Sequence, residues 1–198
     1  MTRFNQVKHT LLGKLENELP RHLTYHNIDH TLDVMQAAEL MANIENIDEN
    51  KKELLLTAAL FHDSGFLKTR DGHEAESCNI ARFYLPIYCY QPQEIDLICN
   101  LIMATMIPQS PENHLAEILC DADLDYLGRD DFFILSERLF TELKTEGIVK
   151  DEETWNRQQA DFMGSHFYFT DTRRKALQHR KECHVELIKS KISTPDLR

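Results

Sequence analysis

Residues 54–65 read Leu-Leu-Leu-Thr-Ala-Ala-Leu-Phe-His-Asp-Ser-Gly, an apolar run that ends on a histidine and an aspartate. The run predicts a buried helix over 54–61, and Ser64-Gly65 predicts its end, because glycine commonly follows the last helical turn. Consecutive side chains on a helix point about 100° apart. His62 and Asp63 can therefore reach one ion together only if the helix ends there and the ion lies over that end.

The pair His62-Asp63 also indicates the class of ion. Imidazole and carboxylate together suit Mn²⁺, Fe²⁺, Co²⁺, Ni²⁺ or Zn²⁺ better than Ca²⁺, which prefers an all-oxygen shell. The expected cofactor is a divalent transition metal ion, with Mg²⁺ also allowed. Such a site indicates a metal-dependent hydrolase.

Further candidate ligands lie on both sides of this pair. His26 and His30 are four residues apart and share one face if both are helical. Two histidines so spaced can bind zinc, but the glutamate motif that usually accompanies them is absent. Asp121 and Asp123 are two residues apart, so on a helix their side chains point about 200° away from each other and cannot both be ligands.

In chain order, His30, His62-Asp63 and Asp123 form the pattern H…HD…D. With these residues and their flanks the chain resembles the HD-domain metal-dependent phosphohydrolases, and among them the uncharacterised bacterial predicted HD phosphohydrolases. The matching segments are YHNIDHT (25–31), AALFHDSG (58–65) and CDADLDYLG (120–128). The resemblance covers about residues 20–145, and it implies a single HD domain over 1–198 with a C-terminal helical extension.

The resemblance implies that four side chains hold the metal: His30, His62, Asp63 and Asp123. Asp123 is preferred to Asp121 because Ala122-Asp123-Leu124 matches the family's context. Asp121 is then expected behind the site or at the surface.

The implied reaction is hydrolysis of a small phosphorylated substrate, either a phosphomonoester or a phosphodiester, with nucleotides among the candidates. The ion would lower the pKa of a water molecule and polarise a phosphoryl oxygen. Asp63 would help to position that water. His26 would protonate the departing alkoxide, since an imidazole near its ordinary pKa suits general acid catalysis at neutral pH.

Residues that follow the His-Asp pair are candidates for substrate contacts. Glu74 could orient a water, or it could be only the first-turn acid that the helix dipole favours. His73 is a candidate for substrate binding, or for the extra histidine of binuclear relatives. Lys68 and Arg70, on a loop expected to overhang the metal, and Arg129 are candidate phosphate ligands, because arginine can grip phosphate with two parallel hydrogen bonds.

The second set of histidines found in binuclear relatives has no counterpart here. Thr105 stands where a histidine is expected and His114 lies in a proline-flanked loop, so one ion is predicted rather than two. Asp125 and His184 are assigned to the surface. The aromatic stretch 162–170 either closes one side of the pocket or belongs to the core.

Composition limits the partners and the compartment. The net charge of -11 argues against binding to a nucleic-acid polymer, because such proteins usually present a basic face. Five cysteines without a CxxC pair fit free thiols in a reducing compartment. The N-terminus lacks the apolar core of a signal peptide, and no apolar run approaches the roughly 20 residues that span a bilayer. We therefore expect a cytoplasmic protein without membrane contact, and leave a homo-oligomer open.

Apolar residues recur at helical spacing along nearly the whole chain, and few windows alternate with period two. The pattern predicts an all-α, single-domain helical bundle. Asn27 or Asp29 is the expected cap of the helix that carries His30. The expected helices span about residues 4–19, 31–41, 54–61, 74–84, 93–106, 115–127, 132–145 and 172–191.

Two other functions compete with hydrolysis. The chain could bind a nucleotide and a metal without turnover, as a sensor or regulatory module. It could also be a di-iron oxygenase, as some HD relatives are, although those use a richer set of histidines. Metal content and an assay of phosphate release separate the three, because a shared fold does not determine chemistry.

Overall fold

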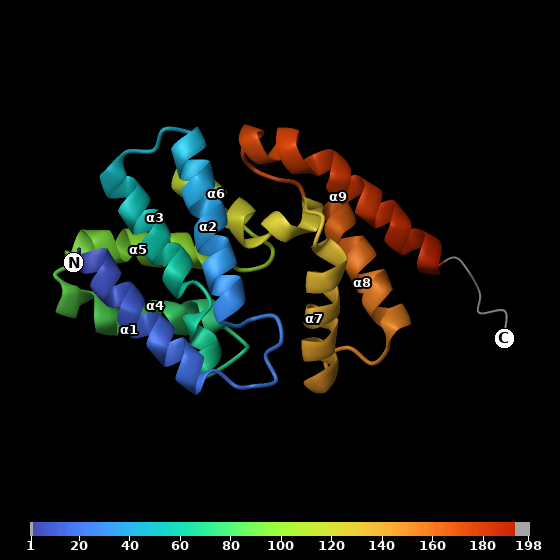
Figure 1. Cartoon of the computed structure of the whole chain (residues 1–198), viewed down its shortest axis with the longest axis horizontal. Helices are drawn as coiled ribbons and strands as arrows, with labels where there is room; N and C mark the ends of the chain where they lie inside the picture. Colours follow the sequence, from blue (N-terminus) through green and yellow to red (C-terminus); the bar gives the residue numbers. More distant parts are fainter. Residues whose placement is uncertain (1, 193–198) are drawn as a thin grey trace. The chain divides into compact units, whose positions relative to one another are not determined.

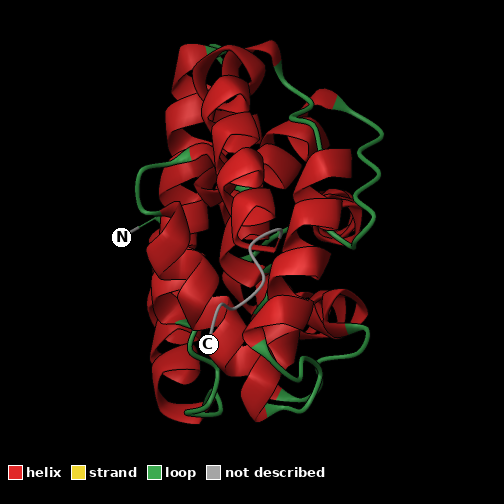
Figure 2. Ribbon diagram, turned by 90° about the vertical axis from the view of Figure 1, so that its right-hand side faces the viewer, coloured by secondary structure: helices red, strands yellow, loops and turns green. Residues whose placement is uncertain are grey.

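The computed structural model describes residues 2–192, and every regular element in that range is a helix (Figure 2). The prediction of an all-α fold is confirmed. The α-helices are α1 (Arg3–Glu18), α2 (Ile28–Ile44), α3 (Glu49–Phe61), α4 (His73–Tyr84), α5 (Pro92–Ala104), α6 (His114–Asp123), α7 (Phe132–Thr145), α8 (Glu152–Ser165) and α9 (Asp171–Ile192). Short 3-10 turns are η1 (Ser64–Leu67), η2 (Leu85–Tyr88) and η3 (Asp125–Gly128).

The chain divides into two compact units, Met1–Asp123 and Leu124–Arg198. The first contains α1 to α6, and the second contains η3 and α7 to α9. A single domain over 1–198 therefore stays a prediction. In the range that the structure describes, no helix is both long and apolar enough to cross a membrane.

Helix α3 forms the centre of the N-terminal unit, where it packs against α1, α2, α4, α5 and α6 (Figure 1). All its residues from Leu54 to Phe61 are buried. A helix surrounded by other helices must be apolar on every side, which explains why this run shows no polar face. The same packing brings the end of α3 close to α2 and α6.

Helix α2 begins between the two histidines of this segment, after His26 and before His30. The Oδ1 atom of Asn27 accepts hydrogen bonds from the backbone N–H groups of Asp29 and His30, at 2.9 and 3.4 Å. This cap makes Ile28 the first helical residue and leaves His26 in the preceding loop. His26 and His30 therefore do not share a helical face, which removes the paired-histidine zinc helix from consideration.

Two expectations about helices were wrong. The single helix expected over 115–127 ends at Asp123, and η3 follows it. Helix α8, over 152–165, was not expected at all. Its buried face consists of Trp155, Gln159, Ala160 and Met163, and this mixture of polar and apolar residues produces only a weak helical pattern.

Two surface assignments were also wrong, both in the C-terminal unit. Asp125 is buried, and its Oδ1 atom lies 2.9 Å from Nε of Arg173. His184 is buried too. Its Nδ1–H donates to the carbonyl oxygen of Leu127 at 2.9 Å, and its ring stacks on that of Phe132. In each case a distant partner compensates the buried polar group.

Candidate metal centre

Four polar side chains converge within the N-terminal unit, each from the end of a helix. His30 lies in the first turn of α2, His62-Asp63 directly follows α3, and Asp123 is the last residue of α6. The packing of α2 against α3 and α6 brings these ends together. All four residues belong to the ligand set implied by the sequence.

The distances within this cluster are short and similar. Nε2 of His30 and Nε2 of His62 lie 3.3 Å apart. Oδ2 of Asp63 is 3.4 and 3.3 Å from these two nitrogens, and Oδ1 of Asp123 is 3.3 and 3.5 Å from them. Neighbouring donors around one ion, each about 2.0–2.2 Å from it, stand roughly 3 to 3.5 Å apart. The spacing therefore fits ligands of a common metal.

The hydrogen bonds around the cluster also fit metal binding. Nδ1–H of His62 donates to the carbonyl oxygen of Ala59 at 2.8 Å, so the neutral ring presents the lone pair of Nε2 to the cluster. The buried Oδ2 atom of Asp63 accepts no hydrogen bond of ordinary geometry. An imidazole lone pair beside a buried carboxylate oxygen without a hydrogen bond suits a divalent transition metal.

Charges in the cluster shift the pKa values of its members. Burial by itself lowers the pKa of His62, but the carboxylates of Asp63 and Asp123 outweigh it and hold that pKa well above its usual value. Burial raises the pKa of Asp123, but hydrogen bonds from His30 and His62 outweigh it and lower that pKa to about 2. Without an ion, a proton on His62 offsets the negative charge of the neighbouring carboxylates, so metal binding requires the loss of that proton.

The turn after α3 is held by contacts that were not expected from the sequence. The hydroxyl of Ser77, fully buried on α4, donates to the carbonyl oxygen of His62 at 2.7 Å and accepts from the N–H of Gly65 at 2.8 Å. A Cβ atom at Gly65 would lie 2.0 Å from the carbonyl oxygen of His73. Gly65 is therefore required for the close approach of α4, and Ser77 fixes the backbone that carries His62 and Asp63.

The two aspartates of α6 occupy different environments. Asp123 joins the cluster, and its Oδ2 atom lies 3.4 Å from Nε2 of Gln109, a residue that sequence reasoning did not single out. Asp121 is fully buried and lies outside the cluster of His30, His62 and Asp123. Its burial excludes the surface, and a place behind the site stays a prediction.

Asp123→Asn is expected to weaken metal binding at least about 10-fold more than Asp121→Asn, because only the first change removes a negative charge from the cluster. Competition with a chromophoric chelator measures both affinities. Circular dichroism of both variants checks that the buried asparagine has not unfolded the chain. The reverse ranking of affinities would move the ligand to Asp121.

His73 and Glu74 begin α4 beside the cluster. Nε2 of His73 lies 3.3 Å from Oδ1 of Asp63 and 3.5 Å from Oε1 of Glu74. Burial lowers the pKa of His73, but the contact with Asp63 outweighs it and raises that pKa above the usual value. Glu74 is buried in the first turn of α4, and both of its expected roles, orienting a water and favouring the helix dipole, stay predictions.

The other candidates, His26, Lys68 and Arg129, each have their own neighbouring side chain. His26 is half-buried and its ring centroid is 5.9 Å from that of His30. Lys68 is exposed and pairs with Glu76. Arg129 belongs to the C-terminal unit, where it pairs with Asp131 at 2.6 Å.

The positions considered for further metal-binding histidines are otherwise engaged. Thr105 is buried and donates to the carbonyl oxygen of Ile102 at 2.8 Å. His114 starts α6 and pairs with Glu45 and Glu117. Neither contributes to the cluster that the described residues form.

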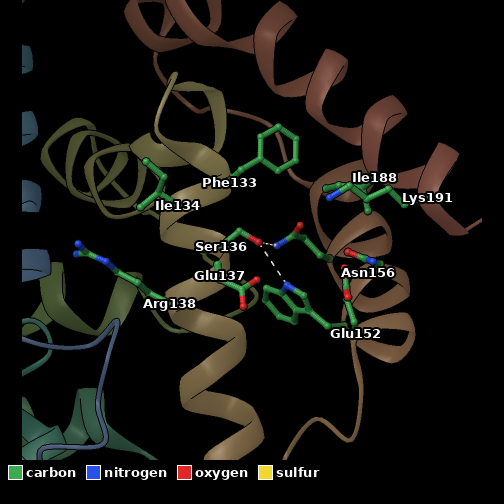
Figure 3. Close-up of a pocket in the computed structure, with 11 residues that line it drawn as sticks. Phe133, Ile134, Ser136, Glu137, Arg138, Glu152, Asn156, Ile188 and Lys191 are labelled. Atoms are coloured by element: carbon green, nitrogen blue, oxygen red, sulfur yellow. Dashed lines mark hydrogen bonds between the residues drawn. The ribbon is translucent and has the colours of Figure 1, made fainter.

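A separate cavity of about 580 Å³ lies in the C-terminal unit between α7, α8 and α9 (Figure 3). At its base Oγ of Ser136 accepts hydrogen bonds from Nε1–H of Trp155 and Nε2–H of Gln159, at 3.3 and 2.5 Å. Its rim carries two acidic and two basic side chains, Glu137, Glu152, Arg138 and Lys191. None of the predicted catalytic, substrate-binding or metal-binding residues lines this cavity.

Comparison with known proteins identifies similar chains. The model of the HD domain family matches residues 27–125. An uncharacterised protein of Clostridium beijerinckii is 33% identical over 109 residues, which make up 54% of this chain and 68% of that protein. Among solved structures, a predicted HD superfamily hydrolase from an uncultured Thermotogales bacterium is 22% identical, with a TM-score of 0.61 over 93% of this chain and 91% of the other. YpgQ of Bacillus subtilis, solved in complex with ADP, is 21% identical, with a TM-score of 0.64 over 98% of this chain and 96% of the other.

Proposed function

Because this chain belongs to the HD domain family, we propose that it is a metal-dependent phosphohydrolase that cleaves a phosphomonoester or phosphodiester. The proposed metal ligands are His30, His62, Asp63 and Asp123. The observation that carries the proposal is the pair of imidazole nitrogens of His30 and His62, 3.3 Å apart at the ends of two helices. Each nitrogen has a carboxylate oxygen of Asp63 and one of Asp123 within 3.3–3.5 Å.

A bound divalent ion would supply two effects there, a lower pKa for a coordinated water and polarisation of a phosphoryl oxygen. The chain's own residues would do the rest. Oδ1 of Asp63, which His73 approaches at 3.3 Å, would help to position the attacking water. His26, on the loop before α2, would donate a proton to the oxygen of the leaving group.

Residues next to this cluster would orient the substrate. His73 and Glu74 lie beside Asp63, and Arg70 lies on the loop that leads into α4. We propose His73, Arg70 and Lys68 as contacts to phosphate, with Glu74 orienting a water. The structurally similar YpgQ binds ADP, which supports a nucleotide as the class of substrate.

Free thiols at all five cysteines support the cytoplasm as the compartment.

A panel of phosphoesters tests the proposal. Nucleoside mono-, di- and triphosphates, a cyclic nucleotide, a sugar phosphate and a nitrophenyl phosphate are incubated with protein loaded with Mn²⁺, Co²⁺, Ni²⁺, Zn²⁺ or Mg²⁺. We expect turnover of at least one substrate, lost on chelation and restored by the metal. Protein treated with chelator is the matched control.

Two results would contradict hydrolysis. Tight nucleotide binding without cleavage of any ester, under every metal, would favour a sensor module. Two irons per chain in elemental analysis would favour an oxygenase.

A further inference from the structure

Phe66 is in contact with three side chains that sequence reasoning assigns to catalysis or substrate binding. It lies in η1, three residues after Asp63, and is buried. Its ring centroid is 4.4 Å from that of His26 and 4.2 Å from that of His73, with interplanar angles of 20° and 31°. Cζ of Arg70 lies 4.9 Å from the same centroid.

These three neighbours come from separate segments of the chain. His26 lies in the loop before α2, Arg70 in the loop after η1, and His73 at the start of α4. Phe66 is therefore the common surface against which the segments pack. Near-parallel rings at such separations and a guanidinium over a phenyl face are favourable aromatic arrangements.

The same contacts connect Phe66 to the metal centre. His73 reaches Oδ1 of Asp63 at 3.3 Å, and the ring of His26 stands edge-on to that of His30. The ring of His26 has a second aromatic neighbour, Tyr25, in a T-shaped contact with ring centroids 4.8 Å apart. The plane of the His26 imidazole is thus set by two aromatic rings.

We propose that Phe66 is a positioning residue that holds the imidazoles of His26 and His73, and the guanidinium of Arg70, in their orientation toward the metal centre. It touches no reacting atom. The catalytic consequence rests on the proposed phosphohydrolase function, whereas the structural part does not. A flat ring restricts rotation of a stacked imidazole, and an aliphatic side chain of similar size fills the space without fixing the ring plane.

Nuclear magnetic resonance tests the structural part without any assay of activity. In zinc-loaded protein, the ring protons of His26 and His73 should be displaced by the ring current of Phe66. In Phe66→Leu these resonances should move toward ordinary histidine positions, while those of His9, on the exposed side of α1, stay unchanged. Phe83→Leu, at an exposed phenylalanine of α4, is the matched control and should move neither imidazole. Unchanged His26 and His73 resonances in Phe66→Leu would overturn the proposal.

Kinetics test the catalytic part. Phe66→Leu is expected to keep stoichiometric metal and to lose roughly 10- to 100-fold in kcat with little change in KM. Phe66→Tyr, which retains a flat ring, is expected to lose less. The loss from Phe66→Leu should be smaller in a His26→Ala background than in the wild type, because part of the effect passes through His26.

Several outcomes separate this proposal from the function on which it depends. An equal loss of kcat from Phe66→Leu in both backgrounds would show that Phe66 does not act through His26. Loss of the metal from Phe66→Leu would show that Phe66 stabilises the metal ligands instead. If Phe66→Leu does not fold by circular dichroism, Phe66→Met replaces it in both arms. A wild type that cleaves no phosphoester would contradict the proposed function, and the resonance positions would still decide whether Phe66 orients the rings.

Discussion

Replacing His62 or Asp63 by alanine is expected to abolish stoichiometric metal binding while leaving the chain helical. Nε2 of His62 lies within 3.5 Å of donor atoms from His30, Asp63 and Asp123, so its loss removes a ligand from the middle of the cluster. Metal ligands contribute to folding as well as to affinity. The variants should therefore also unfold at a lower temperature than the metal-loaded wild type.

Elemental analysis after dialysis measures the metal, and circular dichroism measures the helix content. His9→Ala, at an exposed position of α1, is the control for the loss of a histidine. Because alanine at the buried His62 leaves carboxylates without a partner, Asp63→Asn and His62→Gln serve as gentler changes that preserve volume. Full metal occupancy in either His62→Ala or Asp63→Ala would show that the proposed set of ligands is wrong.

Replacing His26 by alanine is expected to leave metal binding intact and to reduce kcat by roughly 10² to 10⁴, as the loss of a general acid typically does. The loss should shrink for a nitrophenyl phosphate, because its leaving group scarcely needs a proton. The structure supports a role apart from the ligands, since Asn27 caps α2 and leaves His26 in the loop.

Kinetics with a good and a poor leaving group, together with metal analysis, check this expectation. His22→Ala, an exposed position in the same loop, is the matched control. If metal and activity disappear together, His26 supports the site or binds the ion. Equal losses for both leaving groups would assign it to substrate positioning.

Several features could be predicted from the sequence because they depend on short segments. The apolar run 54–61 predicted a helix buried on all sides, and α3 is such a helix. Asn27 was one of two expected caps for the helix that carries His30, since its side chain reaches N–H groups two and three residues ahead. The identities of the candidate ligands also came from local patterns, through the resemblance to HD proteins.

Other features depend on partners far away in the chain. Asp125 and His184 were assigned to the surface because the sequence around a polar residue does not show which distant group it will contact. Asp125 meets Arg173, 48 positions later, and His184 meets the carbonyl oxygen of Leu127. A buried polar group is stable only with such a partner, and its presence is decided by packing.

The sequence by itself determined the all-α class and indicated which residue types could bind a metal, because helical periodicity and a motif are read within a few turns. Only the tertiary structure decided which side chains face one another. Ser77 clamps the turn at His62, Gln109 approaches Asp123, and Phe66 lies against His26 and His73. Apart from Phe66 and His73, which are seven positions apart, these contacts join residues 12 to 40 positions apart. The physical reason is that over such separations the packing of whole helices, and not local preference, sets the distance.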